Sequence, residues 1–269
     1  MSNKFGQIVP EYRLFWQIRE LTAKASQLIG SKNAISFDQI AAIYNLKVNI
    51  TTFHKDGALI NNTIIINSNI RSKKRQNFTF FHELTHHLIE SDDEMLSAIH
   101  QGIREPDEII ERLCDAGAAE LLMPRSKVEE FVQLRGFTAN NIRYLSEEFS
   151  ASEIAVAIHM TVSAYHDCYL VIAEPIAINE NEHLKDLLIR YTSKSSSSKY
   201  SIARNTYIPK RHLMHQVFNP PYMVSGLAPI PFKSGNRFDA HCDAILLDEH
   251  VYAFFNVSQP QSPSQLRLF

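Results

Sequence analysis

Two histidines and a glutamate stand at metal-ligand spacing in FTFFHELTHHLIE, residues 78–90. His82 and His86 are four residues apart, so on a helix both imidazoles project from one face and can bind one divalent ion. Glu83 is rotated from His82 by about 100°, so it can reach a water at that ion without being a ligand. The pattern predicts a zinc-dependent hydrolase, in which the ion acidifies water and polarises a carbonyl while Glu83 transfers the proton. The alternative interpretation is a surface helix with a satisfied histidine pair.

A catalytic zinc ion needs a third protein ligand, and the helix DEIIERLCDAGAAELLMP, residues 107–124, offers Glu111. Glu111 lies at the edge of an apolar stripe, where a carboxylate is costly unless it is paired or coordinated. Asp115 shares its face and is expected to accept a hydrogen bond from a ligating imidazole. Gly117 is small enough to let this helix approach the histidine helix closely. The alternatives are Glu108 as the third ligand, or a solvated surface role for Glu111.

Helical periodicity and capping residues predict the elements that must position these groups. Apolar residues recur every three or four positions from Glu11 to Leu28, and Ser36 is a suitable N-cap for a helix that reaches Tyr44. The metal motif lies on a helix over residues 72–90, and the acidic run 90–94 is interpreted as its solvated end. Pro106 suits the first turn of the next helix, which Pro124 stops at residue 123.

The segment between the second helix and the metal motif predicts a small antiparallel sheet. LKVNITTF alternates in polarity, and the β-branched run TIIIN, Thr63–Asn67, follows the turn-forming pair Asn61-Asn62. We expect this run to be an edge strand next to the metal helix. An extended peptide substrate would then add beside it. The predicted substrate-binding residues are Thr63, Ile64, Ile65 and Ile66.

Two short helices, residues 140–149 and 152–160, are predicted around the link SAS and resemble a helix-turn-helix. This raises the alternative of a DNA-binding regulator. The second helix, SEIAVAIHM, has no lysine or arginine and contains Glu153, whereas contact with phosphate requires basic residues. A packed helical hairpin that supports the peptidase domain is therefore favoured, and direct DNA binding is not expected. The basic residues at 71–75 are interpreted as a solvated helix start.

Beyond residue 162 the character changes to the strand-like runs CYLVIAE, AILLD and VYAFFNV. A helix is expected over Glu182–Tyr191, before the polar break SKSSSSK. The predicted organisation is a metallopeptidase domain (1–137), a helix-turn-helix-like segment (138–162) and a mixed α/β domain (163–269). A third hypothesis makes the protein a ligand-sensing adaptor, and the neighbours His241 and Cys242 are weighed as an oxidation sensor.

Composition limits the remaining classes of function. The chain has 269 residues, 45% of them hydrophobic, which is enough for a sizeable core. Three widely separated cysteines predict neither a disulfide scaffold nor a cysteine-based zinc site, and they suit a reducing cytoplasm. No signal peptide or membrane-spanning run is evident. A net charge of −2 gives no overall attraction to phosphate.

The two helical blocks together closely resemble the signatures of the ImmA/IrrE metallopeptidases, RxxFTxxHExxH and AAxLLMP. Arg75, Phe78 and Thr79 fit the first block, and residues 118–124 fit the second; Gly117 stands where an aromatic residue is common. The resemblance is closest over residues 36–124 and extends to Met160. Beyond that point only the order of the parts matches the longer IrrE-type members of the family.

This resemblance implies an α+β fold with a zincin-like peptidase domain and, as in the longer members, a GAF-like C-terminal domain. It also implies an endopeptidase that cleaves a helix-turn-helix transcriptional repressor and so releases stress and DNA-damage-response genes. Zinc is the expected ion, with Mn2+ or Fe2+ as alternatives, and a small molecule is the expected ligand of the C-terminal domain. No oxyanion-stabilising residue stands out; the candidates are His100, Tyr144 and His159.

Overall fold

A computed structural model describes residues 10–30, 36–103, 105–178, 181–232 and 238–257. The fold is mixed α/β with two small sheets. The chain divides into two compact units, the first comprising residues 1–127 with 149–152 and the second comprising 128–148 with 153–269. Two helices predicted as a separate segment therefore fall in the second unit, and the division at residues 137 and 162 stays a prediction. None of the described helices has the length and apolar character needed to cross a membrane.

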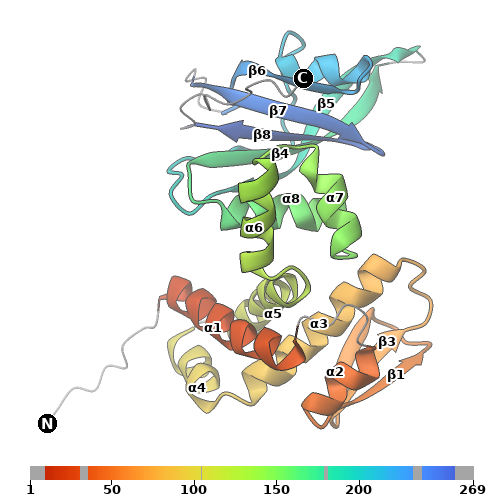
Figure 1. Ribbon diagram of the computed structural model, residues 1–269, viewed down its shortest axis with the longest axis vertical. Coiled ribbons are helices and arrows are strands. Elements are labelled where there is room, and N and C mark those ends of the chain that lie inside the picture. Colours follow the sequence, from red (N-terminus) through yellow and green to blue (C-terminus); the bar gives the residue numbers. More distant parts are fainter. Residues whose placement is uncertain (1–9, 31–35, 104, 179–180, 233–237, 258–269) are drawn as a thin grey trace, which may run out of the picture. The chain divides into compact units, whose positions relative to one another are not determined.

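The first unit contains helices and a three-stranded sheet (Figure 1). The capping residues act as expected: the Ser36 side chain forms a capping box with Gln39, Ser72 accepts from Arg75 N–H, and Pro106 occupies the first turn of its helix. The structure adds a helix that begins directly after Asp92 in the acidic run. The elements are α1 (Glu11–Ile29), α2 (Phe37–Ile43), β1 (Lys47–Thr51), β2 (Gly57–Ile60), β3 (Thr63–Asn67), α3 (Lys73–Glu90), α4 (Asp93–Gly102) and α5 (Pro106–Leu122).

The strand order of this sheet, β1-β3-β2, corrects two predictions. The sheet is mixed and not antiparallel, because β1 pairs with β3 in parallel while β2 and β3 form an antiparallel hairpin. Thr63–Asn67 is the central strand and not an edge strand. Thr63, Ile64, Ile65 and Ile66 pair with β2 on one side and with β1 on the other. No peptide can therefore add beside these four residues, and the predicted substrate-binding role is wrong.

The metal helix α3 packs against β2 and β3 of the sheet and also against α5. Its residues Phe80, Leu84 and Leu88 bury themselves with Ile64 and Ile66 of β3. On α5, a Cβ at Gly117 would lie 2.5 Å from Thr85 Cγ2 of α3, so only glycine permits this approach. The predicted close packing of the two helices is confirmed at this point.

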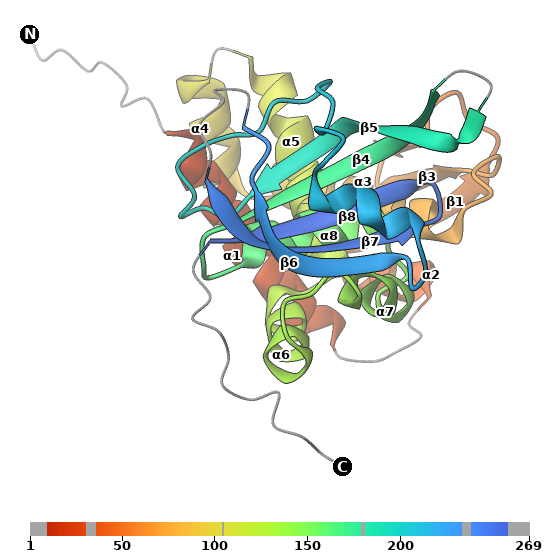
Figure 2. The same cartoon turned by 90° about the horizontal axis from the view of Figure 1, so that it is seen from above.

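The second unit is built on a five-stranded antiparallel sheet, and Figure 2 shows its strands in the order β5-β4-β8-β7-β6. The predicted helix over Glu182–Tyr191 is wrong, since these residues belong to β5 and pair with β4. Its elements are α6 (Arg125–Arg135, which begins in the first unit), α7 (Asn141–Glu148), α8 (Glu153–Ser163), β4 (Cys168–Ile178), β5 (Asn181–Lys194), the 3-10 helix η1 (Leu213–Phe218), β6 (Met223–Pro229), β7 (Asp239–Leu247) and β8 (His250–Asn256).

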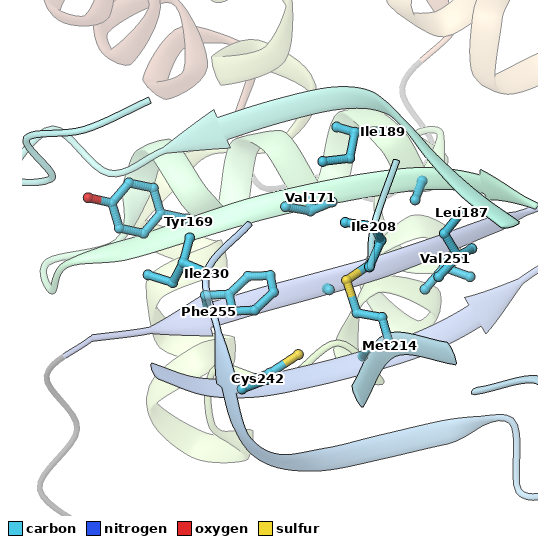
Figure 3. Packing of buried hydrophobic residues seen from close by; sticks show 14 of the residues in the cluster. Tyr169, Val171, Leu187, Ile189, Ile208, Met214, Ile230, Cys242, Val251 and Phe255 are labelled. Atoms are coloured by element: carbon cyan, nitrogen blue, oxygen red, sulfur yellow. The ribbon is translucent and has the colours of Figure 1, made fainter. Parts of the chain in front are cut away.

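Alternate residues of this sheet serve two layers. Val171 and Phe255 join Met214 of η1 in the apolar cluster on one face, which Figure 3 shows. On the other face, the ring of Phe254 lies 4.7 Å from that of Phe137, which precedes α7, and α8 packs against β4 and β5. The GAF-like character of this unit and the zincin-like character of the first unit stay predictions.

Candidate metal centre

The two histidines of α3 face one point. His82 Nε2 and His86 Nε2 lie 3.2 Å apart, and both side chains are largely buried. Helix geometry alone accounts for this pairing, because residues four apart lie above one another on the same face. The predicted histidine pair is therefore present with its ring nitrogens directed at a common position.

Glu111 of α5 brings a carboxylate to the same position. Its Oε2 lies 3.3 Å from His82 Nε2, and its Oε1 lies 3.5 Å from His86 Nε2. The side chain is 64% exposed, so it approaches the rings from the solvent side and not from the core. This donor set consists of two imidazoles and a carboxylate, and it is open to solvent on one side. It fits a catalytic divalent ion such as zinc.

Asp115 orients the first histidine. Its Oδ1 lies 3.0 Å from His82 Nδ1, so the ring donates there and leaves Nε2 as the atom that faces Glu111. Burial would lower the pKa of His82, but the hydrogen bond to Asp115 and the nearby carboxylates outweigh it, and the pKa is raised. Burial lowers the pKa of His86. His86 therefore favours the neutral form that binds metal.

Cys114 is a second neighbour of the histidine pair that the sequence did not point to. One ligand atom from each of His82, His86 and Cys114 lies within 4.8 Å of the others. The thiol is fully buried, and burial raises its pKa above the ordinary value, so it stays protonated at neutral pH. We favour Glu111 over Cys114 as the third ligand, because its carboxylate lies within 3.5 Å of both rings, whereas burial disfavours the thiolate of Cys114 that a metal would require.

Glu83 is positioned beside the histidines in a partly dehydrated environment. The residue is only 8% exposed, and burial raises its pKa to about 7. The charge of His82 opposes this rise in pKa, as do the backbone N–H of Leu59, which donates to the carboxylate, and the charge of Lys55; the value of about 7 already includes these effects. A carboxyl group that titrates near neutrality suits a residue that both accepts and donates a proton.

These side chains line one cleft of about 510 Å3 in the first unit. One wall is α3, another is α5, and a third is the segment Lys55–Leu59, which includes most of β2. Thr63–Ile66 do not line it, and Ile64 and Ile66 are buried in the core instead. The lining residues are Lys55, Asp56, Gly57, Ala58, Leu59, Phe78, Thr79, His82, Glu83, His86, Glu90, Glu111 and Asp115.

The contribution of β2 was not predicted, although Gly57 carried a signal for it. A Cβ on Gly57 would lie 2.5 Å from Thr79 Cγ2 and 2.9 Å from Glu83 Oε1. A glycine at the start of a strand often marks such a close approach. Glu108, the alternative third ligand, does not line the cleft. Of the candidates for stabilising an oxyanion, His100 does not line it either, and Tyr144 and His159 belong to the second unit.

The helix-turn-helix-like pair is not arranged for reading DNA. In α8, which would be the recognition helix, Val156, His159 and Met160 are buried, and the helix packs against β4 and β5. A recognition helix must instead present its side chains to the major groove. The pair is packed, as interpreted, but α8 packs against the sheet of the second unit, so the predicted support of the peptidase domain is not what these contacts provide.

Comparisons with known proteins point in one direction. Residues 42–161 match the family model described as the IrrE N-terminal-like domain. The chain is 31% identical over 212 residues to the radiation response metalloprotease IrrE of Deinococcus deserti. The matched region covers 75% of this chain and 74% of that protein. The chain is also 28% identical over 204 residues to the protein of the same name from Deinococcus radiodurans, and this match covers 71% of this chain and 62% of that protein.

One solved structure, a Mycobacterium tuberculosis transcriptional regulator, is similar with a TM-score of 0.55. The match covers 91% of this chain and 76% of that chain at 14% identity. A likeness at this identity concerns the fold alone.

Proposed function

Because this chain belongs to the IrrE metalloprotease family, we propose that it is a zinc-dependent endopeptidase whose metal ligands are His82, His86 and Glu111. The observation that carries the proposal is the convergence of two ring nitrogens and one carboxylate, from two helices, within 3.5 Å. An ion held there supplies Lewis acidity, which acidifies water and polarises the scissile carbonyl.

The chain's own residues do the remaining work. Glu83 accepts the proton of the attacking water and donates it to the leaving amine, a task for which its pKa of about 7 is suited. Asp115 keeps the His82 ring in one orientation and one tautomer. Burial along α3 and β2 keeps the dielectric low around Glu83, which strengthens its interaction with a developing charge.

The substrate backbone adds along β2 and not along β3. In the β2–β3 hairpin, Ile60 pairs with Thr63 around the two-residue turn Asn61-Asn62, so the N–H and C=O groups of Gly57 and Leu59 point away from β3. No strand among the described residues pairs with that outer edge. Leu59 N–H is engaged by the Glu83 carboxylate, so a peptide that pairs with the remaining outward groups of this edge runs past the catalytic residue.

The biological role follows from the relatives. They are named radiation response metalloproteases, and we propose that this protein likewise acts in a stress response in the cytoplasm, by cutting a helix-turn-helix transcriptional repressor. The second unit, with its antiparallel sheet, is proposed as the GAF-like sensor that binds a small ligand.

The test is to incubate the protein, with zinc or with manganese, with the helix-turn-helix repressor encoded nearest to its gene, and to look for one discrete fragment. Glu83→Gln should abolish the fragment and keep a full complement of metal, whereas Glu111→Gln should lose both. Cleavage by Glu83→Gln at the wild-type rate would refute the assigned mechanism. If wild-type protein leaves the repressor intact but retards random DNA in a salt-dependent gel shift, the regulator hypothesis replaces the protease.

A further inference from the structure

Three residues of α3 that are four positions apart, Arg75, Thr79 and Glu83, all contact the segment that forms the outer strand β2. Residues at this spacing form one stripe on a helix. The catalytic carboxylate is therefore the last of three contacts that fix β2 to the metal helix. The first two contacts have no part in the chemistry proposed above.

The first contact is an ion pair. Arg75 Nε donates to Asp56 Oδ2 at 2.8 Å, and Arg75 Nη2 donates to the same oxygen. Asp56 directly precedes β2, and its carbonyl accepts a hydrogen bond from Asn67 N–H at 2.8 Å, at the end of β3. The start of β2 is thereby tied both to the first turn of α3 and to the sheet.

The second contact is steric. Gly57 approaches Thr79 so closely that any side chain would collide with it. The third is the hydrogen bond from Leu59 N–H to Glu83. Because the residues from Gly57 to Leu59 are all paired with β3, a shift at Asp56 reaches Leu59 through ordered strand and not through a loop.

We propose that Arg75 and Asp56 are positioning residues that hold the outer edge of β2 in place, so that an added peptide lies in register with Glu83. This inference rests on the proposed endopeptidase function and on the strand addition described for it. Both side chains of the ion pair are about half exposed, 65% and 48%, so the pair contributes little to global stability. Its two donors on one oxygen fix a direction, which is what positioning requires.

The experiment compares Arg75→Gln, Asp56→Asn and the reversed pair, Arg75→Asp with Asp56→Arg. The matched control is Glu11→Gln, which removes an ion pair of similar exposure between Glu11 and Arg112, at 3.0 Å, far along the chain from β2. Two quantities are measured on the full chain: amide hydrogen exchange of residues 57–60, and kcat and KM for the tryptic peptide that the wild-type protein cuts fastest from a proteome digest.

Arg75→Gln and Asp56→Asn should each exchange the β2 amides about tenfold faster and raise KM about tenfold, with unchanged zinc content. A loss of folded protein lowers the apparent kcat but does not raise KM. The reversed pair should recover both quantities to within about threefold of wild type, and Glu11→Gln should change neither.

Exchange and KM that match those of Glu11→Gln in both single variants would overturn the inference. Equal damage in the reversed pair and the single variants would overturn it as well. If the wild-type protein cuts neither the repressor nor any peptide, the proposed function fails on its own, and the exchange measurement still decides whether the ion pair holds β2.

Discussion

Gly117→Ala tests whether the close approach of α5 to α3 builds the metal centre. The added Cβ would lie 2.5 Å from Thr85 Cγ2, 3.0 Å from Thr85 Oγ1 and 3.3 Å from Ile18 Cγ1. The shortest contact falls at least about 1 Å below ordinary carbon–carbon separation. Thr85 cannot rotate away easily, because it is β-branched and its hydroxyl donates to Phe81 O at 2.7 Å. The helices must therefore move apart.

Overpacking of this kind costs about 2–3 kcal/mol, while alanine gains about 1 kcal/mol over glycine in a helix. The free energy of unfolding should therefore fall by about 1–2 kcal/mol. Because Glu111 and Gly117 are on the same helix, the displacement also moves the carboxylate away from the histidines, and zinc affinity should fall about tenfold. Denaturant unfolding and competition with a chromophoric chelator measure the two effects.

The control is Thr85→Ser, which removes Cγ2 and keeps the hydroxyl. In that background the 2.5 Å contact disappears while the 3.0 Å contact with the hydroxyl oxygen remains, so Gly117→Ala should lower the free energy of unfolding clearly less than it does with Thr85 present. A Gly117→Ala protein that is as stable as the wild type and binds zinc equally well would refute the reasoning, because the contact between Gly117 and Thr85 would then not limit the approach of Glu111 to the histidines.

Three further predictions concern the metal and the second unit. Asp115→Asn should weaken zinc binding about 10- to 100-fold, as measured by chelator competition, because the amide is a weaker acceptor for His82. Zinc at a hundredfold excess over its Kd should stabilise the folded protein by about 2.7 kcal/mol, and His86→Ala should lose this increment in thermal unfolding. Burial raises the pKa of Asp243, so the folded state binds the carboxyl proton more tightly than the unfolded state does. The free energy of unfolding of the wild type, relative to that of Asp243→Asn, should therefore fall as the pH rises from about 4. Stabilities of the two proteins that change in parallel with pH would contradict this prediction.

Local chemistry made much of the geometry of the candidate metal centre predictable. Ser72 and Pro106 mark the starts of α3 and α5, and the four-residue spacing places His82 and His86 on one face whatever the rest of the chain does. Glu111 lies within 3.5 Å of both rings, as expected, but its side chain is 64% exposed, so the predicted cost of a carboxylate beside an apolar stripe does not explain its position. These inferences need only contacts within a helix or between its neighbours.

The errors arose where pairing between distant segments decides the outcome. Which strand is the edge depends on the parallel pairing of β1 with β3, and alternation within TIIIN carries no information about it. The residues of β5 have helical periodicity, yet Leu187 and Ile189 alternate into the buried cluster once β4 is present as a partner. Asp92 caps α4, and Met95, Leu96 and Ile99 follow it at helical spacing, so the sequence carried a signal for this helix that the acidic run concealed.

The path of the chain between the two units constrains how the protein can be dissected. Residues 149–152 belong to the first unit, although the chain has already entered the second at residue 128. A fragment that stops at residue 127 therefore lacks four residues of the unit that bears the histidines. Expression of an isolated peptidase fragment calls for an end beyond residue 152, and the end of α8 at Ser163 is a suitable choice because the match to the family model stops close to it, at residue 161.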